Sequence, residues 1–110
     1  LERAADEAPT QREGPFDLAM LYYRRGDWAL CRYWAMRTLA VTERDYNYMT
    51  DPAAWGPEPY DLSAIANWHL GHYDEALDAA RAALELAPGD ERLRRNMEII
   101  QGGAVNGRTE

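Results

Sequence analysis

Residues 70–88 read LGHYDEALDAARAALELAP, and this stretch decides the fold. Gly71 permits a tight turn, because glycine readily adopts the left-handed backbone that such turns often need. The aromatic ring of Tyr73 can fill the wedge between two helices, and the alanines that follow let a neighbouring helix approach closely. Pro88 ends the segment, because proline cannot continue a helix. The stretch therefore predicts a glycine turn followed by a closely packed helix over residues 73–87.

A second copy of the pattern lies earlier in the chain, where residues 16–28 read FDLAMLYYRRGDW. In both copies an alanine, Ala19 or Ala64, lies seven residues before the glycine, where a small residue lets the next helix approach closely. An aromatic residue, Trp28 or Tyr73, lies two residues after the glycine. Repetition of a helix–turn–helix unit is typical of helical solenoids, in which each unit packs on its neighbours. From this spacing we expect helices at about residues 2–8, 13–25, 28–41, 59–70, 73–87 and 90–101.

The pattern resembles the tetratricopeptide repeat, a helix pair of about 34 residues. With Gly26 and Gly71 at equivalent positions, Pro9 and Pro88 both fall near the end of a repeat. The resemblance implies an all-α, right-handed helical solenoid with two full helix pairs and a partial repeat at each end. The expected parts of a repeat domain over 1–101 are the end of a preceding repeat (1–9), repeat one (12–41), a long inserted loop (42–58), repeat two (59–88) and a capping helix (90–101), followed by a flexible tail (102–110).

A narrower resemblance rests on four runs: DPAAWG at 51–56, PYDL at 59–62, WHLG at 68–71 and DERLRRN at 90–96. Together they look like the repeat region that follows the catalytic domain in some bacterial and phage family 2 glycosyltransferases. The chain itself has no Asp-x-Asp motif and no alternation of strands and helices. The resemblance therefore implies a non-catalytic portion that positions an acceptor or a partner subunit.

Charge and composition narrow the classes of partner. The formal net charge is −7, which disfavours nucleic acid because binding to phosphates needs a basic surface. The apolar runs are too short to span a membrane. The single cysteine, Cys31, rules out a disulfide within one chain and fits a reducing compartment. We therefore expect a cytoplasmic protein with no nucleic-acid partner and no membrane partner.

The residues capable of chemistry are better explained by structure. Cys31 occupies a small-residue slot of the repeat, where a buried, unreactive thiol is the simpler interpretation. His69 and His72 are three residues apart, but Gly71 breaks the helix between them and disfavours a shared metal. The carboxylates near Asp74 fall on a predicted exposed face. We predict no catalytic residue, no metal site and no cofactor.

The first helices of stacked repeats are expected to line one concave groove. Its predicted composition is aromatic, apolar and arginine-rich, as at many binding hot spots. The predicted partner-binding residues are Phe16, Met20, Tyr23, Arg24, Asp61, Ile65, Trp68, His69, Arg92 and Arg95, with Glu13, Glu58 and Ile99 at the same helical positions. The alternative is that Met20, Tyr23 and Ile65 mainly pack helix on helix, because the array is short.

The inserted loop carries three aromatic residues, Tyr46, Tyr48 and Trp55. Pro52, Pro57 and Gly56, with Pro59 directly after the loop, prevent one regular helix there. Long loops in compact domains are often functional. Exposed rings could stack on a sugar or grip a peptide. The alternative is that they fold back onto the solenoid, with Trp55 as an anchor in the core.

These observations predict a scaffold that binds a protein or a peptide. The half-repeat at 1–9 would expose an apolar face, which suggests self-association or contact with more chain there. Two alternatives stay open. The chain could be a structural subunit of a large, even viral, assembly, or a glycan-binding segment of an enzyme.

Overall fold

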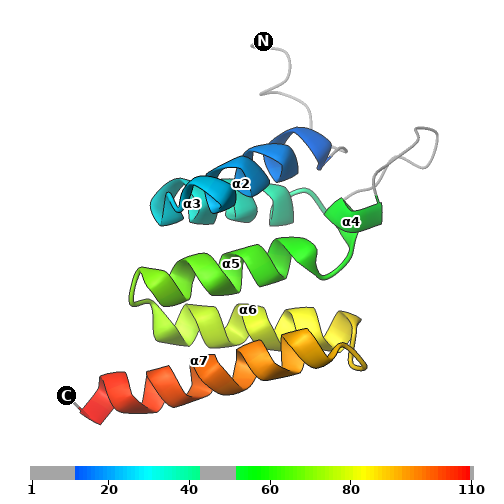
Figure 1. The fold of residues 1–110 in the computed structure, drawn as a ribbon. Coiled ribbons are helices and arrows are strands. Elements are labelled where there is room, and N and C mark those ends of the chain that lie inside the picture. The colour runs from blue at the N-terminus through cyan, green and yellow to red at the C-terminus, as the bar shows by residue number, and fades with distance from the viewer. Residues whose placement is uncertain (1–11, 43–51, 110) are drawn as a thin grey trace.

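The computed structural model describes residues 12–42 and 52–109, with residue 52 and residues 103–109 described by their backbone alone. Those residues form helices only and contain no strand, which confirms the all-α prediction. The helices are α2 (Glu13–Arg25), α3 (Trp28–Leu39), α4 (Pro52–Trp55), α5 (Glu58–His69), α6 (Tyr73–Leu86) and α7 (Glu91–Thr109). The five long helices lie side by side in one stack, with successive long helices running in opposite directions (Figure 1).

One glycine turn joins the two helices of each pair. Gly26 lies between α2 and α3 with φ 71°, and Gly71 lies between α5 and α6 with φ 83°. In both turns the residue after the glycine donates its N–H to a carbonyl five residues back: Asp27 to Tyr22 at 3.0 Å, and His72 to Asn67 at 2.8 Å. A side chain at either glycine would find open space, so the left-handed backbone is what requires glycine there.

Small buried residues let the helices pack closely. The first core cluster joins α2, α3, α4 and α5, and the second joins α5, α6 and α7. The first contains Phe16, Ala19, Cys31, Ala35, Ala54, Leu62 and Ala66. The second contains Ala64, Ala76, Ala80 and Ile100. The alanines predicted from the repeat to be contact points, Ala19 and Ala64, are almost completely buried.

Arg12 fastens α4 to the stack. Its Nε donates to the carbonyl of Val41 at 2.9 Å and its Nη1 to the carbonyl of Ala54 at 3.1 Å. The guanidinium also lies 4.2 Å from the centroid of the Trp55 ring. Trp55 in turn packs against the first core cluster, so its ring is an anchor, as one interpretation of the loop expected. Burial lowers the pKa of Arg12, but an arginine stays charged at any physiological pH.

The sequence and the structure differ at the C-terminal end. The sequence predicts a flexible tail at 102–110, whereas α7 continues as a helix through Thr109. Glycines at 102 and 103 each disfavour a helix by only about 1 kcal/mol relative to alanine, so they are weaker stop signals than proline. The predicted half-repeat at 1–9 and the loop residues Tyr46 and Tyr48 lie outside the described residues.

Candidate partner-binding site

A hollow of about 340 Å³ opens where α2, α5 and α7 come together. We call it the α2–α5–α7 hollow. It is lined by Tyr23, Ile65, Trp68, His69, Arg92, Asn96, Ile99 and Ile100. Most of this lining is aromatic or aliphatic, and the volume lies at the small end of ligand pockets, enough for one or two large side chains.

Stacked rings hold one wall of the hollow. His69 stacks face to face on Trp28, with ring centroids 4.0 Å apart and planes 1° from parallel, and meets Trp68 edge-on at 5.0 Å. Tyr23 meets Trp28 edge-on at 5.9 Å. Each ring therefore limits the movement of the next, and such pairs contribute about 0.5–1.5 kcal/mol beyond burial of their area. The wall is formed before any partner arrives.

An ion pair forms the polar side. Arg92 donates through Nη1 to Asp61 Oδ2 at 2.7 Å, and Asn96 donates through Nδ2 to Asp61 Oδ1 at 3.3 Å. The Asp61 side chain is 11% exposed, whereas the Arg92 side chain is 55% exposed. The hydrogen bond to Asp61 raises the pKa of Arg92. Because a guanidinium has five N–H donors, Arg92 can hold Asp61 and still donate to a partner.

Five of the ten predicted groove residues line the hollow: Tyr23, Ile65, Trp68, His69 and Arg92. The others lie elsewhere. Phe16 is buried in the first core cluster and Met20 packs against it. Arg24 and Arg95 are exposed but do not line the hollow, and Asp61 acts through Arg92 and Asn96.

Two residues of the lining, Asn96 and Ile100, were not predicted from the sequence. They follow Arg92 by four and eight residues, so they share its face of α7. Extending the helical spacing along that helix would have found both. Ile99, which was named by its helical position, does line the hollow.

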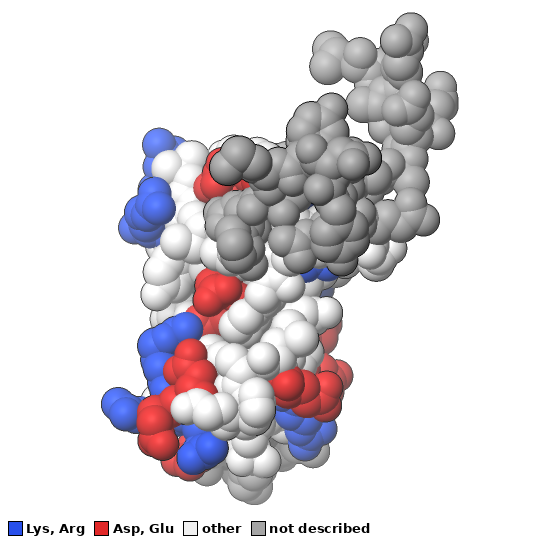
Figure 2. All heavy atoms as spheres, turned by 90° about the vertical axis from the view of Figure 1, so that its right-hand side faces the viewer, with Lys and Arg blue, Asp and Glu red and all other residues white. Residues whose placement is uncertain are grey.

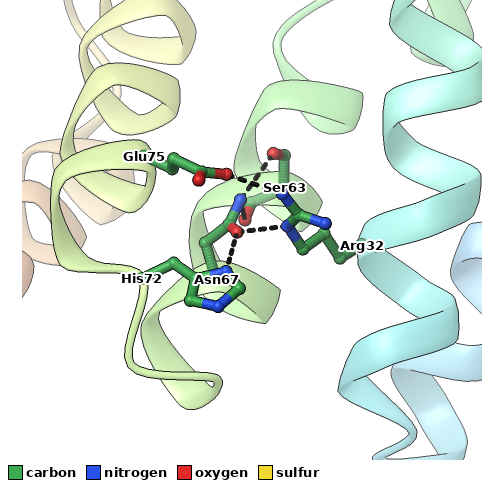
Figure 3. A network of polar contacts seen from close by, with 5 residues as sticks. All are labelled: Arg32, Ser63, Asn67, His72 and Glu75. Atoms are coloured by element: carbon green, nitrogen blue, oxygen red, sulfur yellow. Dashed lines mark hydrogen bonds and ion pairs between the residues drawn. The ribbon is translucent and has the colours of Figure 1, made fainter.

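A second polar cluster joins the two repeats (Figure 3). Arg32 on α3 donates to Asn67 Oδ1 on α5 at 2.7 Å and to Glu75 Oε2 on α6 at 2.8 Å. Asn67 donates in turn to the Ser63 carbonyl at 2.9 Å, and His72 Nδ1 lies 3.3 Å from Asn67 Oδ1. The hydrogen bond from Arg32 lowers the pKa of Glu75. We interpret the cluster as a structural tie, since its polar groups bind one another.

Cys31 and the histidines show no arrangement for catalysis. Burial raises the pKa of the Cys31 thiol to about 11, so the thiol stays protonated near neutral pH. His69 is stacked on Trp28, and His72 faces Asn67. Within 12–42 and 52–109, no three His, Cys, Asp or Glu residues come together as ligands for one metal ion.

Surface charge is mixed on the face seen in Figure 2. There, acidic and basic side chains lie next to one another, mostly over the end of the stack that holds α6 and α7. Among the described residues visible on that face, charges of one sign form no broad patch. Of the helices that the structure describes, none combines the length and the apolar character required to cross a bilayer.

One segment of the chain matches a known protein family. Residues 57–90 match the family model of the tetratricopeptide repeat, and this segment contains α5, α6 and the Gly71 turn. The match supports the tetratricopeptide assignment made from the residues. No curated protein and no solved structure matches the chain.

Proposed function

We propose that this chain is a non-catalytic protein-interaction module whose α2–α5–α7 hollow receives an apolar side chain of a partner peptide. Tetratricopeptide repeats generally mediate protein–protein interactions, and one such repeat is matched here. The observation that carries the proposal is the hollow itself, an apolar space with a preformed aromatic wall.

The lining suggests how a peptide would bind. Ile99 is 54% exposed and Tyr23 is 37% exposed, so both present apolar surface that a partner could cover. Burial of apolar surface contributes about 25 cal/mol per Å², and a single well-packed anchor can supply a large share of the affinity. Arg92 would then donate to a backbone carbonyl or a carboxylate beside the anchor.

The larger protein in which such a module works is a separate part of the proposal. A glycosyltransferase-like parent, in which the module positions an acceptor or a partner subunit, is supported only by the resemblance of the four sequence runs. Analysis of the coding sequence upstream of Leu1 tests it, and a nucleotide-sugar domain there would be the supporting result.

The peptide-binding proposal can be tested by selecting displayed peptides on the immobilised full chain and measuring affinity by calorimetry. We expect Ile99→Asp to weaken a selected peptide at least about tenfold, or about 1.4 kcal/mol. Leu86→Asp is the matched control, because Leu86 is also 54% exposed but lies on α6, outside the hollow. Equal effects of the two variants, or selection of no peptide, would contradict the proposal.

The glycan alternative has its own outcome in the same design. An aromatic wall can also stack on a sugar ring. A glycan array that binds the chain, with the signal lost in Tyr23→Ala and no peptide selected, would replace the peptide by a glycan as the occupant of the hollow.

A further inference from the structure

The solvent-facing side of α3 is apolar. We call it the α3 outer face, and it consists of Ala29, Leu30, Tyr33, Met36, Arg37 and Ala40. Leu30, Tyr33 and Met36 are 38%, 46% and 48% exposed. Arg37 is the only charged residue of the set. A helix at the surface of a soluble protein normally carries charged residues on this side, so the α3 outer face needs an explanation.

The second repeat provides an internal control. When Gly26 is aligned with Gly71, each residue of α3 has a counterpart on α6. The counterparts of the α3 outer face are, in order, Asp74, Glu75, Asp78, Arg81, Ala82 and Glu85. Five of these six are charged, and those five are exposed. Packing within a repeat therefore does not require apolar residues at these positions, and the α3 outer face is apolar for another reason.

We propose that the α3 outer face binds the same face of a second copy of this chain, with the two α3 helices antiparallel about a two-fold axis at Tyr33. An isologous contact needs a surface that is complementary to itself. In this arrangement Tyr33 meets its own symmetry mate, Leu30 lies opposite Met36, and Ala29 lies opposite Arg37. The Tyr33 pair and the Leu30–Met36 pair each bring two apolar side chains together. In the third pair the small Ala29 leaves room for the long side chain of Arg37.

Charge supports a second copy as the occupant. Arg37 donates through Nη1 to the Tyr33 hydroxyl at 3.1 Å, which keeps its guanidinium on this face. Asp27 is exposed at the start of α3, and neither Arg37 nor Asp27 has an ion-pair partner among the described residues. With a rise of 1.5 Å per residue, Arg37 and the symmetry-related Asp27 lie within about 3 Å of each other along the helix axes.

The overall charge favours the same face. Two copies with a net charge of −7 each repel one another at long range. The α3 outer face has no acidic residue, so no pair of carboxylates opposes contact between these faces. The contact involves about 18 Å of one helix from each chain, which places it at the low end of specific interfaces. We therefore expect a reversible dimer in about the micromolar range. The α3 outer face and the α2–α5–α7 hollow have no residue in common.

Sedimentation velocity on the full chain tests the dimer. Between about 1 and about 500 µM, we expect the wild type to shift from monomer to dimer. Tyr33→Asp installs the residue that α6 carries at the same position and should weaken the dimer at least about tenfold. Leu86→Asp is again the matched control and should not weaken it. A chain that stays monomeric throughout, or equal loss in both variants, overturns the proposal.

Disulfide trapping tests the geometry in a variant that keeps the face apolar. Cys31 is the only cysteine and is completely buried, so Tyr33→Cys would provide the single accessible thiol. A thiol on the two-fold axis faces its own symmetry mate. In air-saturated buffer we expect dissolved oxygen, as the two-electron acceptor, to oxidise the two thiols rapidly to a disulfide-linked dimer. Asp78→Cys, at the equivalent position of α6, is the control. If Tyr33→Cys crosslinks no faster than Asp78→Cys, the antiparallel α3 contact is wrong. Circular dichroism of each variant establishes that it is folded.

Discussion

Helices α3 and α6 occupy the same position in successive repeats. Their inner sides carry similar small residues, whereas their outer sides differ in polarity. On the inner side the equivalent positions are buried in both helices: Cys31 with Ala76, Ala35 with Ala80, and Thr38 with Ala83. On the outer side Tyr33 corresponds to Asp78, and Met36 to Arg81. The inner side therefore specifies the fold, whereas the outer side is free to specify what the molecule contacts.

Helices α3 and α6 also differ in amphipathicity, so this property alone does not show that they occupy equivalent positions. Helix α6 has the pattern of a single surface helix, with charges on the side that faces solvent. Helix α3 is apolar nearly all round, which is usual for a helix covered on every side. In the described residues α3 packs against α2 and α5, and its third side is uncovered. The contact that would cover that side is the one proposed above.

The largest expected effect tests the equivalence of the inner sides. Cys31 and Ala76 are both completely buried in the same slot of their repeats. Replacing either by leucine overfills the slot, and we expect each variant to lose about 2–3 kcal/mol of unfolding free energy. Urea unfolding measures this loss. Glu85→Leu, at an exposed site, should change stability by less than about 0.5 kcal/mol. A large loss in only one of the two slots would show that they are not equivalent.

The features that the sequence predicted well are local. A glycine with positive φ, a small residue seven positions before it and an aromatic residue two positions after it are set by short-range geometry. Helices α2 and α6 accordingly lie within a residue of their predicted bounds. The wall residues Tyr23, Trp68 and His69 follow from helical spacing measured back from the same glycines.

The features that the sequence missed depend on distant partners. Phe16 was placed in the groove, yet it lies in a core cluster that includes Ala54 from α4, and the position of α4 was not predictable from any local pattern. The repeat pattern predicts only that Arg12 begins repeat one. Its acceptors, the carbonyls of Val41 and Ala54, lie 29 and 42 residues away along the chain.

A smaller effect is expected from the polar tie between the repeats. Asn67 is 2% exposed and binds both Arg32 and Ser63, whereas its counterpart in the first repeat is Tyr22. Asn67→Ala should lose about 2 kcal/mol of unfolding free energy, because buried donors and acceptors lose their partners.

The Asn67 prediction has a built-in check on the network. Arg32→Leu introduces the residue type found at the equivalent position of α6, Leu77, and should lose about 1 kcal/mol. The double variant should lose less than the sum of the two single losses, because the residues share one hydrogen bond. Additive losses in urea unfolding would show that the network does not act as a unit.

A reciprocal exchange should change association more than stability. Asp78→Tyr together with Arg81→Met gives α6 two of the three large apolar outer residues of α3. Both sites are exposed, so the unfolding free energy of the monomer should change by less than about 0.5 kcal/mol. Each chain would then have a second outer face with an apolar centre, although Asp74, Glu75 and Glu85 stay charged. Sedimentation should therefore show some species larger than a dimer. If the double variant associates only as the wild type does, apolar character alone does not explain self-association through the α3 outer face.

The smallest expected effect is the pH dependence of the Arg32–Glu75 pair. The hydrogen bond from Arg32 lowers the pKa of Glu75 below 4.5, so the folded state prefers the ionised carboxylate. That preference stabilises the fold above about pH 4.5 and is lost as the pH falls through the lowered pKa. Because the Glu75 side chain is 56% exposed, the contribution should be under about 0.5 kcal/mol. Urea unfolding should show wild type slightly more stable than Glu75→Gln near pH 6, with the difference shrinking as the pH falls below about 4.5. The control variant Glu85→Gln, on the same helix, should show no such dependence on pH. If the stability difference between wild type and Glu75→Gln stays constant with pH, the difference arises from packing rather than charge.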